Sequence, residues 1–562
     1  MNKYTTMKFV GSLMVGIGLT ASTWVHAQSD PSGERRVTGT YAIKNATVTT
    51  APGRSISGAT ILVKNGLIEA VGTNVNIPKD AQVLAGDGLF IYPGFIDGAS
   101  TSGVKKPTDP ERPANFDPSN PPDELAGITP WRSVLDYYET KNNQISDWRK
   151  AGITIAQILP EGGMIPGKSA IVTYGSSSST NILAQQTGLA AKLRSSGGGR
   201  SMYPGTVLGV MAKFRDIHEN AVLSSKHDRL FASNNGLNRP EINKTLQAFY
   251  PVIDKQIPVL FEVTNDLEVR RALILQKELG FKLVLVGASD IDHLAQDIKK
   301  ANAQVLLSLN LPEEKNMKNG GDLSEEQKAR TDRVQKAYQD ALKQASALEK
   351  ANIPFGFTSM GAKPNDLMKN LSIMVKNGLS EQAALAALTT NPAQILGISR
   401  FAGTLEKGKL ANLVLLTAPL FHEDAQVKHV IADGYLFNYD VKAKAAANGN
   451  GTNNIQGTWD YSSDTPAGSS SGTMDIKKEG DTYTGSISYD NPSGSGKASS
   501  PMKNISLSGT TLSFSFDVVA GGMNLEVTVT GEINADQFTG SMTLRDFGSF
   551  PLNATKKPNQ NN

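Results

Sequence analysis

Apolar and polar positions follow two different periods along the chain, and these periods predict its main elements. Between residues 90 and 359, short runs that are apolar throughout alternate with longer amphipathic stretches. Strands that are apolar on both faces are typical of a parallel sheet covered by helices. The apolar runs are 90–97, 153–159, 171–174, 258–263, 282–287, 304–309 and 354–359. The stretches that predict helices are 266–279, 291–301, 324–351 and 364–376.

This alternation predicts an α/β fold of the (β/α)8 barrel type, also called a TIM barrel. Such a barrel needs eight strands, and the apolar runs supply one fewer. We expect the missing strand in the segment 200–250. The barrel domain itself is expected over residues 90–398.

The two segments that flank the barrel carry shorter strand signals. Asn65-Gly66 separates the apolar runs 60–63 and 67–71. This dipeptide is the strongest short hairpin signal, because a type I′ turn needs a positive φ at both central residues. Strand signals return late in the chain but are too few for a domain of their own. We therefore predict a composite β-sandwich built from residues 37–89 and 399–438.

The last part of the chain has a different pattern. Residues 439–455 are rich in Ala, Asn and Gly, which predicts a linker. Residues 456–556 alternate apolar and polar positions, which predicts an antiparallel lipocalin-like barrel or sandwich. The segment Gly457-Thr458-Trp459 is similar to the start of lipocalin-like barrels, and we expect Trp459 to fill one end of the barrel.

The first residues resemble a secretory signal peptide. Lys3 and Lys8 precede the apolar run 9–25, and Val25-His26-Ala27 has the small residues that signal peptidase needs. The run is shorter and more polar than the ~20 residues of a membrane-spanning helix. We expect residues 1–27 to be removed and the protein to be exported, to the periplasm or the medium, with no membrane span.

Composition removes several classes of function. The 562 residues include no cysteine, which excludes disulfide scaffolds, thiolate metal sites and thiol catalysis. The formal net charge is +3 and no basic block is present, so no nucleic-acid partner is expected. The expected partner is a small molecule bound at the mouth of the barrel.

Two motifs at opposite ends of the barrel segment carry a family resemblance. The first is Ile61 to Gly72 followed by Pro93-Gly94-Phe95-Ile96-Asp97, and the second is Thr389 to Ile398 followed by Gly403 to Leu416. Together they resemble the metal-dependent amidohydrolase superfamily, especially its imidazolonepropionase-like branch. The resemblance covers about residues 40–438. It implies hydrolysis of non-peptide C–N bonds in small or cyclic amides, with one or two divalent metals at the barrel mouth.

The family's metal ligands are replaced in this chain. Where the resemblance implies the histidine pair of the first strand, the sequence has Ala99 and Thr101. Glu262 stands at the next histidine position and Gly287 at the following one. Ser359 stands at the position of the final aspartate. We therefore expect no metal cofactor of the usual kind, and the chain resembles a pseudoenzyme.

Carboxylates offer the remaining catalytic chemistry. Asp97, Glu161 and Glu262 follow or end predicted strands, where they could act as acid and base or hold a divalent cation through oxygen ligands. These three are the candidate catalytic residues. The competing interpretation gives Asp97 a local hydrogen-bonding role and makes Glu161 a solvated loop residue.

The loop before the third apolar run contains Gly167-Lys168-Ser169. It differs from a phosphate-binding loop in two ways. Gly163 and Gly167 are four residues apart in sequence instead of five, and no long helix follows. We expect a loop at the barrel mouth in which Lys168, together with Ser359, contacts the substrate or ligand. Two functions remain open: an exported hydrolase with an atypical carboxylate site, or a non-catalytic binding or scaffold protein that uses the barrel cleft or the C-terminal β domain.

Overall fold

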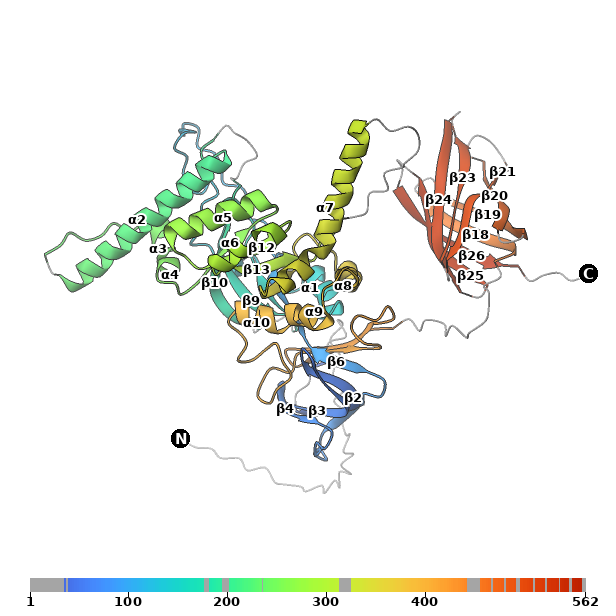
Figure 1. Cartoon of the computed structure of the whole chain (residues 1–562), viewed down its shortest axis with the longest axis horizontal. Coiled ribbons are helices and arrows are strands. Elements are labelled where there is room, and N and C mark those ends of the chain that lie inside the picture. The colour runs from blue at the N-terminus through green and yellow to red at the C-terminus, as the bar shows by residue number, and fades with distance from the viewer. Residues whose placement is uncertain are drawn as a thin grey trace, which may run out of the picture. The chain divides into compact units, whose positions relative to one another are not determined.

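The computed structural model forms two compact units, Met1–Val441 and Lys442–Asn562 (Figure 1). The structure describes residues 35–36, 39–175, 181–194, 202–234, 236–312, 325–441, 455–465, 468–479, 482–491, 496–508, 511–520, 523–534, 536–544 and 548–557. The predicted signal peptide and most of the predicted linker lie outside these residues. No helix in the described part of the chain is both long enough and apolar enough to cross a membrane.

An eight-stranded barrel sheet forms the centre of the first unit. Its strands follow one another around the sheet in chain order. They are β7 (Phe95–Ser100), β8 (Ile153–Ile158), β9 (Gly167–Thr173), β10 (Ile182–Lys192), β11 (Val259–Glu262), β12 (Leu283–Ala288), β13 (Gln304–Ser308) and β14 (Phe355–Thr358). The Thr358 hydroxyl donates a hydrogen bond of 2.6 Å to the Ala99 carbonyl, which connects the last strand to the first. The predicted barrel is confirmed.

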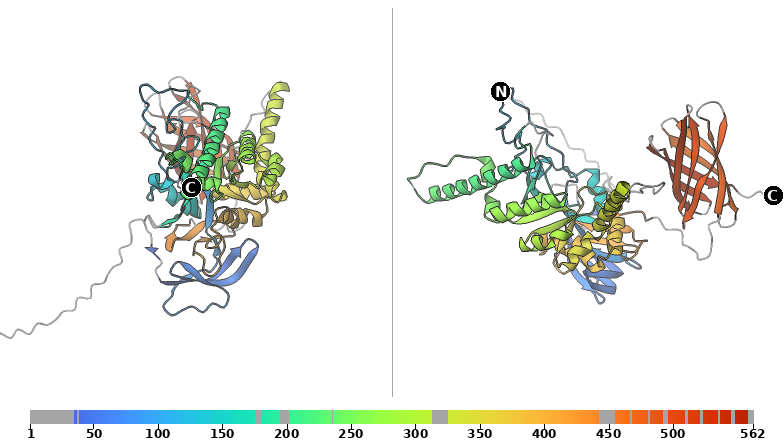
Figure 2. Two further views of the ribbon diagram at one scale, coloured as in Figure 1. Left: turned by 90° about the vertical axis from the view of Figure 1, so that its left-hand side faces the viewer. Right: turned by 45° about the horizontal axis from the view of Figure 1, so that its top comes forward.

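Helices cover the outside of this sheet, as Figures 1 and 2 show. They are α1 (Asn143–Lys150), α2 (Val207–Ser233), α3 (Lys244–Gln247), α4 (Tyr250–Ile253), α5 (Asp266–Leu279), α6 (Ala295–Lys300), α7 (Glu325–Lys350), α8 (Leu367–Lys376), α9 (Glu381–Leu388) and α10 (Thr390–Ile395). Helix α5 has the predicted bounds because its ends are capped. Asn265 accepts from the Glu268 amide at 3.0 Å, and Gly280 follows with a φ of 74°.

Three details of the predicted barrel are wrong. The eighth strand is β10, whereas the segment 200–250 holds α2. The polar sequence Gln185-Gln186-Thr187 and two register shifts interrupt the apolar pattern of β10. Strand β9 runs antiparallel to both of its neighbours, so the sheet is not parallel throughout.

The third error concerns the run 90–97, which divides into two strands. Residues Phe90–Pro93 form β6 of the flanking sheet, and β7 of the barrel begins at Phe95. Gly94 stands between them because a Cβ there would lie 2.2 Å from the Thr154 hydroxyl oxygen. The close approach of Thr154 therefore requires glycine at the point where the chain passes from one sheet to the other.

The flanks join in one nine-stranded sheet. Its members are β1 (Arg35–Arg36), β2 (Thr40–Ala51), β3 (Arg54–Lys64), β4 (Leu67–Gly72), β5 (Gln82–Ala85), β6, β15 (Leu413–Leu416), β16 (Val427–Ala432) and β17 (Tyr435–Asn438). Antiparallel pairing of β6 with β15 joins the N-terminal and C-terminal contributions. The predicted hairpin at Asn65-Gly66 is confirmed, with φ values of 52° and 77°.

The second unit is an antiparallel sheet of nine strands, so the predicted all-β domain is confirmed. The strands are β18 (Gly457–Thr465), β19 (Gly468–Glu479), β20 (Thr482–Asp490), β21 (Lys497–Pro501), β22 (Lys503–Ser508), β23 (Thr511–Ala520), β24 (Met523–Asn534), β25 (Gln537–Leu544) and β26 (Gly548–Lys556). Trp459 is buried among Phe514, Phe516 and Phe538 in a contiguous apolar core. Its indole NH donates to the Ile455 carbonyl at 3.0 Å.

Candidate functional site

Asp97 is the most unusual ionisable residue at the barrel. It lies on β7 with 2% of its surface exposed. Its Oδ1 accepts hydrogen bonds from the backbone amides of Ser359 at 3.0 Å and Ala99 at 3.2 Å. Burial raises the pKa of Asp97 to about 6, although the hydrogen bonds from Ser359, Ala99 and Ser100 favour the charged form. Asp97 therefore joins β7 to the residue that follows β14, and its burial favours the protonated form.

A group of buried hydroxyls surrounds this carboxyl group. Ser100 Oγ lies 3.0 Å from Ser359 Oγ and 3.1 Å from Ser102 Oγ. The Tyr174 hydroxyl donates to Ser100 Oγ at 3.5 Å, and burial together with the nearby charge of Asp97 raises the pKa of Tyr174. The structure thus brings Asp97 and Ser359 together. It adds Ser100, Ser102 and Tyr174, which could not be selected from the sequence because isolated hydroxyl residues carry no spacing signal.

Glu262 lies elsewhere, at the end of β11. Its Oε2 is 2.9 Å from Lys192 Nζ, and the two side chains are 23% and 18% exposed. Lys192 and Glu262 are direct neighbours in the β10–β11 register. Lys192 could not be selected from the sequence because the pattern of β10 is interrupted by polar residues and register shifts.

Glu161 lies in the loop between β8 and β9, and Lys168 is the second residue of β9. Lys168 Nζ donates to Gln186 Oε1 at 3.1 Å, and burial lowers the pKa of Lys168. Its backbone amide donates to the Arg132 carbonyl at 2.9 Å. A Cβ at Gly167 would lie 2.6 Å from that carbonyl oxygen, and the φ of Gly167 is 144°. This close backbone contact explains why residue 167 is a glycine. No phosphate-binding role is needed to explain it.

The three candidate carboxylates do not form a common cluster. Among the described residues, one group of three acidic or histidine side chains has its ligand atoms within 4.8 Å of one another, and it contains Asp290, Asp292 and His293. These three side chains are exposed and follow β12. Catalytic roles for Asp97, Glu161 and Glu262 stay predictions.

A second polar cluster inside the barrel was also missed. Gln157 of β8 is buried and donates through Nε2 to Thr187 Oγ1 at 2.9 Å and to Ser169 Oγ at 3.2 Å. Ser169 Oγ and Thr187 Oγ1 lie 2.9 Å apart. The alternation Ile155, Gln157, Leu159 could have shown that Gln157 shares a strand face with apolar residues.

Sequence and structure comparisons agree with this geometry. The profile of the amidohydrolase family matches residues 329–437. This part of the chain is similar to the amidohydrolase family. An amidohydrolase from Thermotoga maritima MSB8 has a similar structure, with a TM-score of 0.58 and 21% sequence identity, over 71% of this chain and 100% of that one.

More distant solved structures include a Xaa-Pro dipeptidase with methionine bound in its active site. Its TM-score is 0.43 at 14% identity, over 71% of this chain and 100% of that chain. No curated protein matches the chain.

Amidohydrolases are usually metal-dependent, so the fit of a metal at the family positions can be tested. The side chain of Ala99 has no atom that could bind a metal, and the residue is 0% exposed. It packs in an apolar cluster inside the barrel whose other members are Leu159, Leu260, Val284, Val286 and Leu306. Gly287 also lacks a donor atom, and Glu262 is paired with Lys192. These residues do not fit the histidine-rich metal centre that the superfamily implies.

Proposed function

We propose that this protein is an exported amidohydrolase-superfamily member that does not perform metal-dependent C–N hydrolysis, and that it acts in binding or as a scaffold. The observation that carries the proposal is the position of Ala99. A histidine ligand at this place needs polar surroundings and room for an ion, whereas Ala99 is enclosed by Leu260, Val286 and other apolar side chains. Burying a metal ion among such side chains would leave its charge without compensation.

The charge pair at the end of β11 supports the same proposal. A general base must have a free lone pair directed at the proton it removes. One of the two oxygens of the Glu262 carboxylate, Oε2, is instead directed at the Lys192 ammonium at 2.9 Å. The role of Glu262 is therefore explained by an ion pair that joins the neighbouring strands β10 and β11.

The chain between β7 and α1 also supports it. The Thr129 amide donates to the Ile165 carbonyl at 2.7 Å, and the Ile165 amide donates to the Gly127 carbonyl at 3.0 Å. Ile128 and Ile165 are both buried. The residues that precede β9 are therefore held in place by the β7–α1 segment, an arrangement that suits a rigid scaffold.

Metal analysis of the purified mature protein tests the proposal. After expression with added zinc, manganese and iron, we expect well under one equivalent of each metal per chain, and no metal-stimulated hydrolysis of simple or cyclic amides. One equivalent of tightly held metal together with amide hydrolysis would contradict it. The double variant Asp290→Ala/His293→Ala is the control. Any metal that the natural protein binds and this variant does not bind was held at the exposed cluster and not inside the barrel.

Hydrolysis by carboxylates without metal is the second candidate function. The raised pKa of Asp97, about 6, favours it because a general acid works best near the operating pH. In this case metal-free protein would hydrolyse an amide substrate, and Asp97→Asn would lose this activity. Glu262→Gln distinguishes the roles of the two carboxylates, since full activity in this variant leaves Glu262 as a structural residue.

Export is part of the proposal and rests on residues 1–27. Lys3 and Lys8 followed by an apolar run have the order of a signal peptide. N-terminal sequencing of the protein recovered outside the cytoplasm should begin at Gln28. Recovery of the intact N-terminus from the cytoplasm alone would contradict export.

A further inference from the structure

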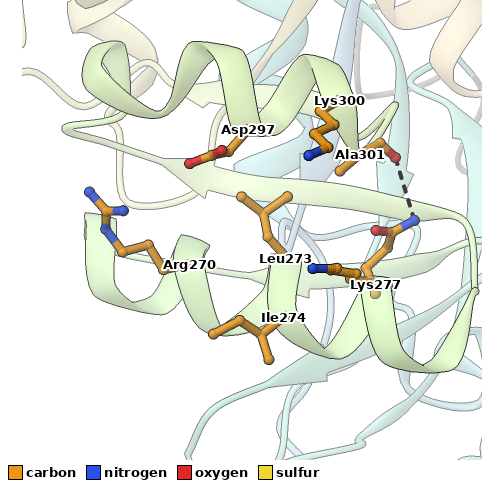
Figure 3. Close-up of a pocket in the computed structure, with 8 residues that line it drawn as sticks. Arg270, Leu273, Ile274, Lys277, Asp297, Lys300 and Ala301 are labelled. Atoms are coloured by element: carbon orange, nitrogen blue, oxygen red, sulfur yellow. Dashed lines mark hydrogen bonds between the residues drawn. The ribbon is translucent and has the colours of Figure 1, made fainter.

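A groove between α5 and α6, on the outside of the barrel, has no part in the proposed function. It has a volume of about 440 Å³. Figure 3 shows the two helices as its walls, with Leu273 between them. Eight residues line it: Arg270, Leu273, Ile274, Gln276, Lys277, Asp297, Lys300 and Ala301. The volume falls within the range of small-molecule sites.

One part of this groove is apolar. Leu273 is buried at its floor, and Ile274 is 47% exposed on α5. Ala301 adds a small side chain after α6. The Gln276 side-chain amide donates to the Ala301 carbonyl at 3.4 Å, which joins the two walls (Figure 3). The groove thus has an apolar floor that is held between two helices.

The other part of the groove is positively charged. Three cationic side chains and one carboxylate line it, so its formal charge is positive. Arg270 has Asp266 as a partner at 3.8 Å. For Lys277 and Lys300, no carboxylate of the described residues lies within 4.0 Å, and Figure 3 shows them on opposite walls of the groove, near Ala301. Two ammonium groups without carboxylate partners in one groove attract an anion.

We propose that this groove binds a small organic anion with an aliphatic chain, such as a medium-chain carboxylate. The carboxylate contacts Lys277 and Lys300, and the chain lies along Leu273 and Ile274. Each part of this ligand matches one observed part of the groove. Burial of methylene groups adds affinity, and the two lysines select the charge of the head group.

Calorimetric titration of the full-length mature protein with sodium octanoate tests the proposal. We expect saturable binding at one site, weaker binding of hexanoate, and no detectable binding of octyltrimethylammonium, which has a similar chain and the opposite charge. Binding should weaken as salt concentration rises, because exposed charges are screened. Equal binding of the cationic ligand would overturn the proposal.

Matched variants locate the site. Lys277→Glu/Lys300→Glu should lower octanoate affinity at least about tenfold. Lys299→Glu is the charge control, since Lys299 lies in the same last turn of α6 but does not line the groove. Ile274→Gln should weaken binding, whereas Leu267→Gln, at a residue of α5 that is 53% exposed and outside the groove, should not. Equal losses in the test and control variants would place binding elsewhere and overturn the proposal.

Discussion

The two halves of the barrel are built differently. From β11 to β14 each strand is parallel to the next, and α5, α6 and α7 lie between them in sequence. From β8 to β10 the strands are antiparallel neighbours with no intervening helix among the described residues. The regular half contributes Leu260, Val284 and Leu306 to the apolar interior, whereas the irregular half contributes the Gln157 cluster. The Gln157 cluster therefore lies where the βα repeat is interrupted, whereas the Asp97 cluster lies where β7 meets the end of β14.

Leu306→Ala should have the largest effect, because it removes an apolar contact between the halves. Leu306 is fully buried, and a Cβ on Gly98 of β7 would lie 2.3 Å from its Cδ2. We expect the free energy of unfolding to fall by about 2–5 kcal/mol. Chemical denaturation of the barrel measures it. The exposed Leu267→Ala is the control and should change the free energy by less than about 0.5 kcal/mol.

Asp97→Asn should change the pH dependence of stability. The pKa of Asp97 is about 6 in the folded protein and 3.8 ordinarily, so the folded state holds the proton more tightly. The stability that this proton provides is present below pH 4 and is lost as pH rises to 6. The free energy of unfolding of the variant, relative to the natural protein, should rise by about 2 kcal/mol between pH 4 and pH 7.

Denaturation of both proteins across this pH range measures the difference. A constant difference between them would show that Asp97 has the same pKa in the folded and unfolded states. Asparagine is a suitable replacement because it keeps an oxygen that can accept from the amides of Ser359 and Ala99.

Gln157→Leu tests the polar cluster of the irregular half. The substitution removes donors to Thr187 and Ser169 while keeping a similar volume. We expect the free energy of unfolding to fall by about 1–2 kcal/mol, because the buried hydroxyl of Ser169 and the partly buried hydroxyl of Thr187 lose a partner but keep each other. Gln186→Leu, at an exposed residue that contacts Lys168, serves as the control. An unchanged free energy of unfolding in Gln157→Leu would mean that water replaces the amide as hydrogen-bond donor to the two hydroxyl groups.

Glu262→Gln should have the smallest effect on stability. The pair with Lys192 is partly exposed, so solvent screens much of its attraction. We expect a loss of about 0.5–1 kcal/mol that decreases at high salt. A double-mutant cycle with Lys192→Met gives the coupling energy. A coupling near zero would indicate that the two side chains do not interact in solution.

The regular half could be predicted almost residue by residue. The apolar runs 258–263, 282–287, 304–309 and 354–359 contain β11 to β14, because parallel strands covered on both faces are apolar throughout. Helix α5 follows from its amphipathic pattern and from the caps Asn265 and Gly280. These signals are local, so a single sequence contains them.

The irregular half could not be predicted in the same way. Strand β10 contains three consecutive polar residues, and its pairing with β9 shifts in register. Such a strand is stable because Gln186 and Thr187 find partners on β9 and β8, and this depends on residues distant in the chain. The same holds for the site: Asp97 and Ser359 could be selected from the family motifs, but Ser100, Tyr174 and Lys192 could not.

The sequence by itself determined the barrel, the flanking hairpin, the antiparallel second unit and the absence of ligand atoms at Ala99 and Gly287. These properties depend on the period of apolar residues, on turn chemistry and on side-chain identity. Only the tertiary structure decided that Asp97 is buried against Ser359, that Glu262 is paired with Lys192 and that α5 and α6 form a cationic groove. Burial, ion pairing and groove shape arise from contacts between strands and helices far apart in sequence, and local patterns carry no information about such contacts.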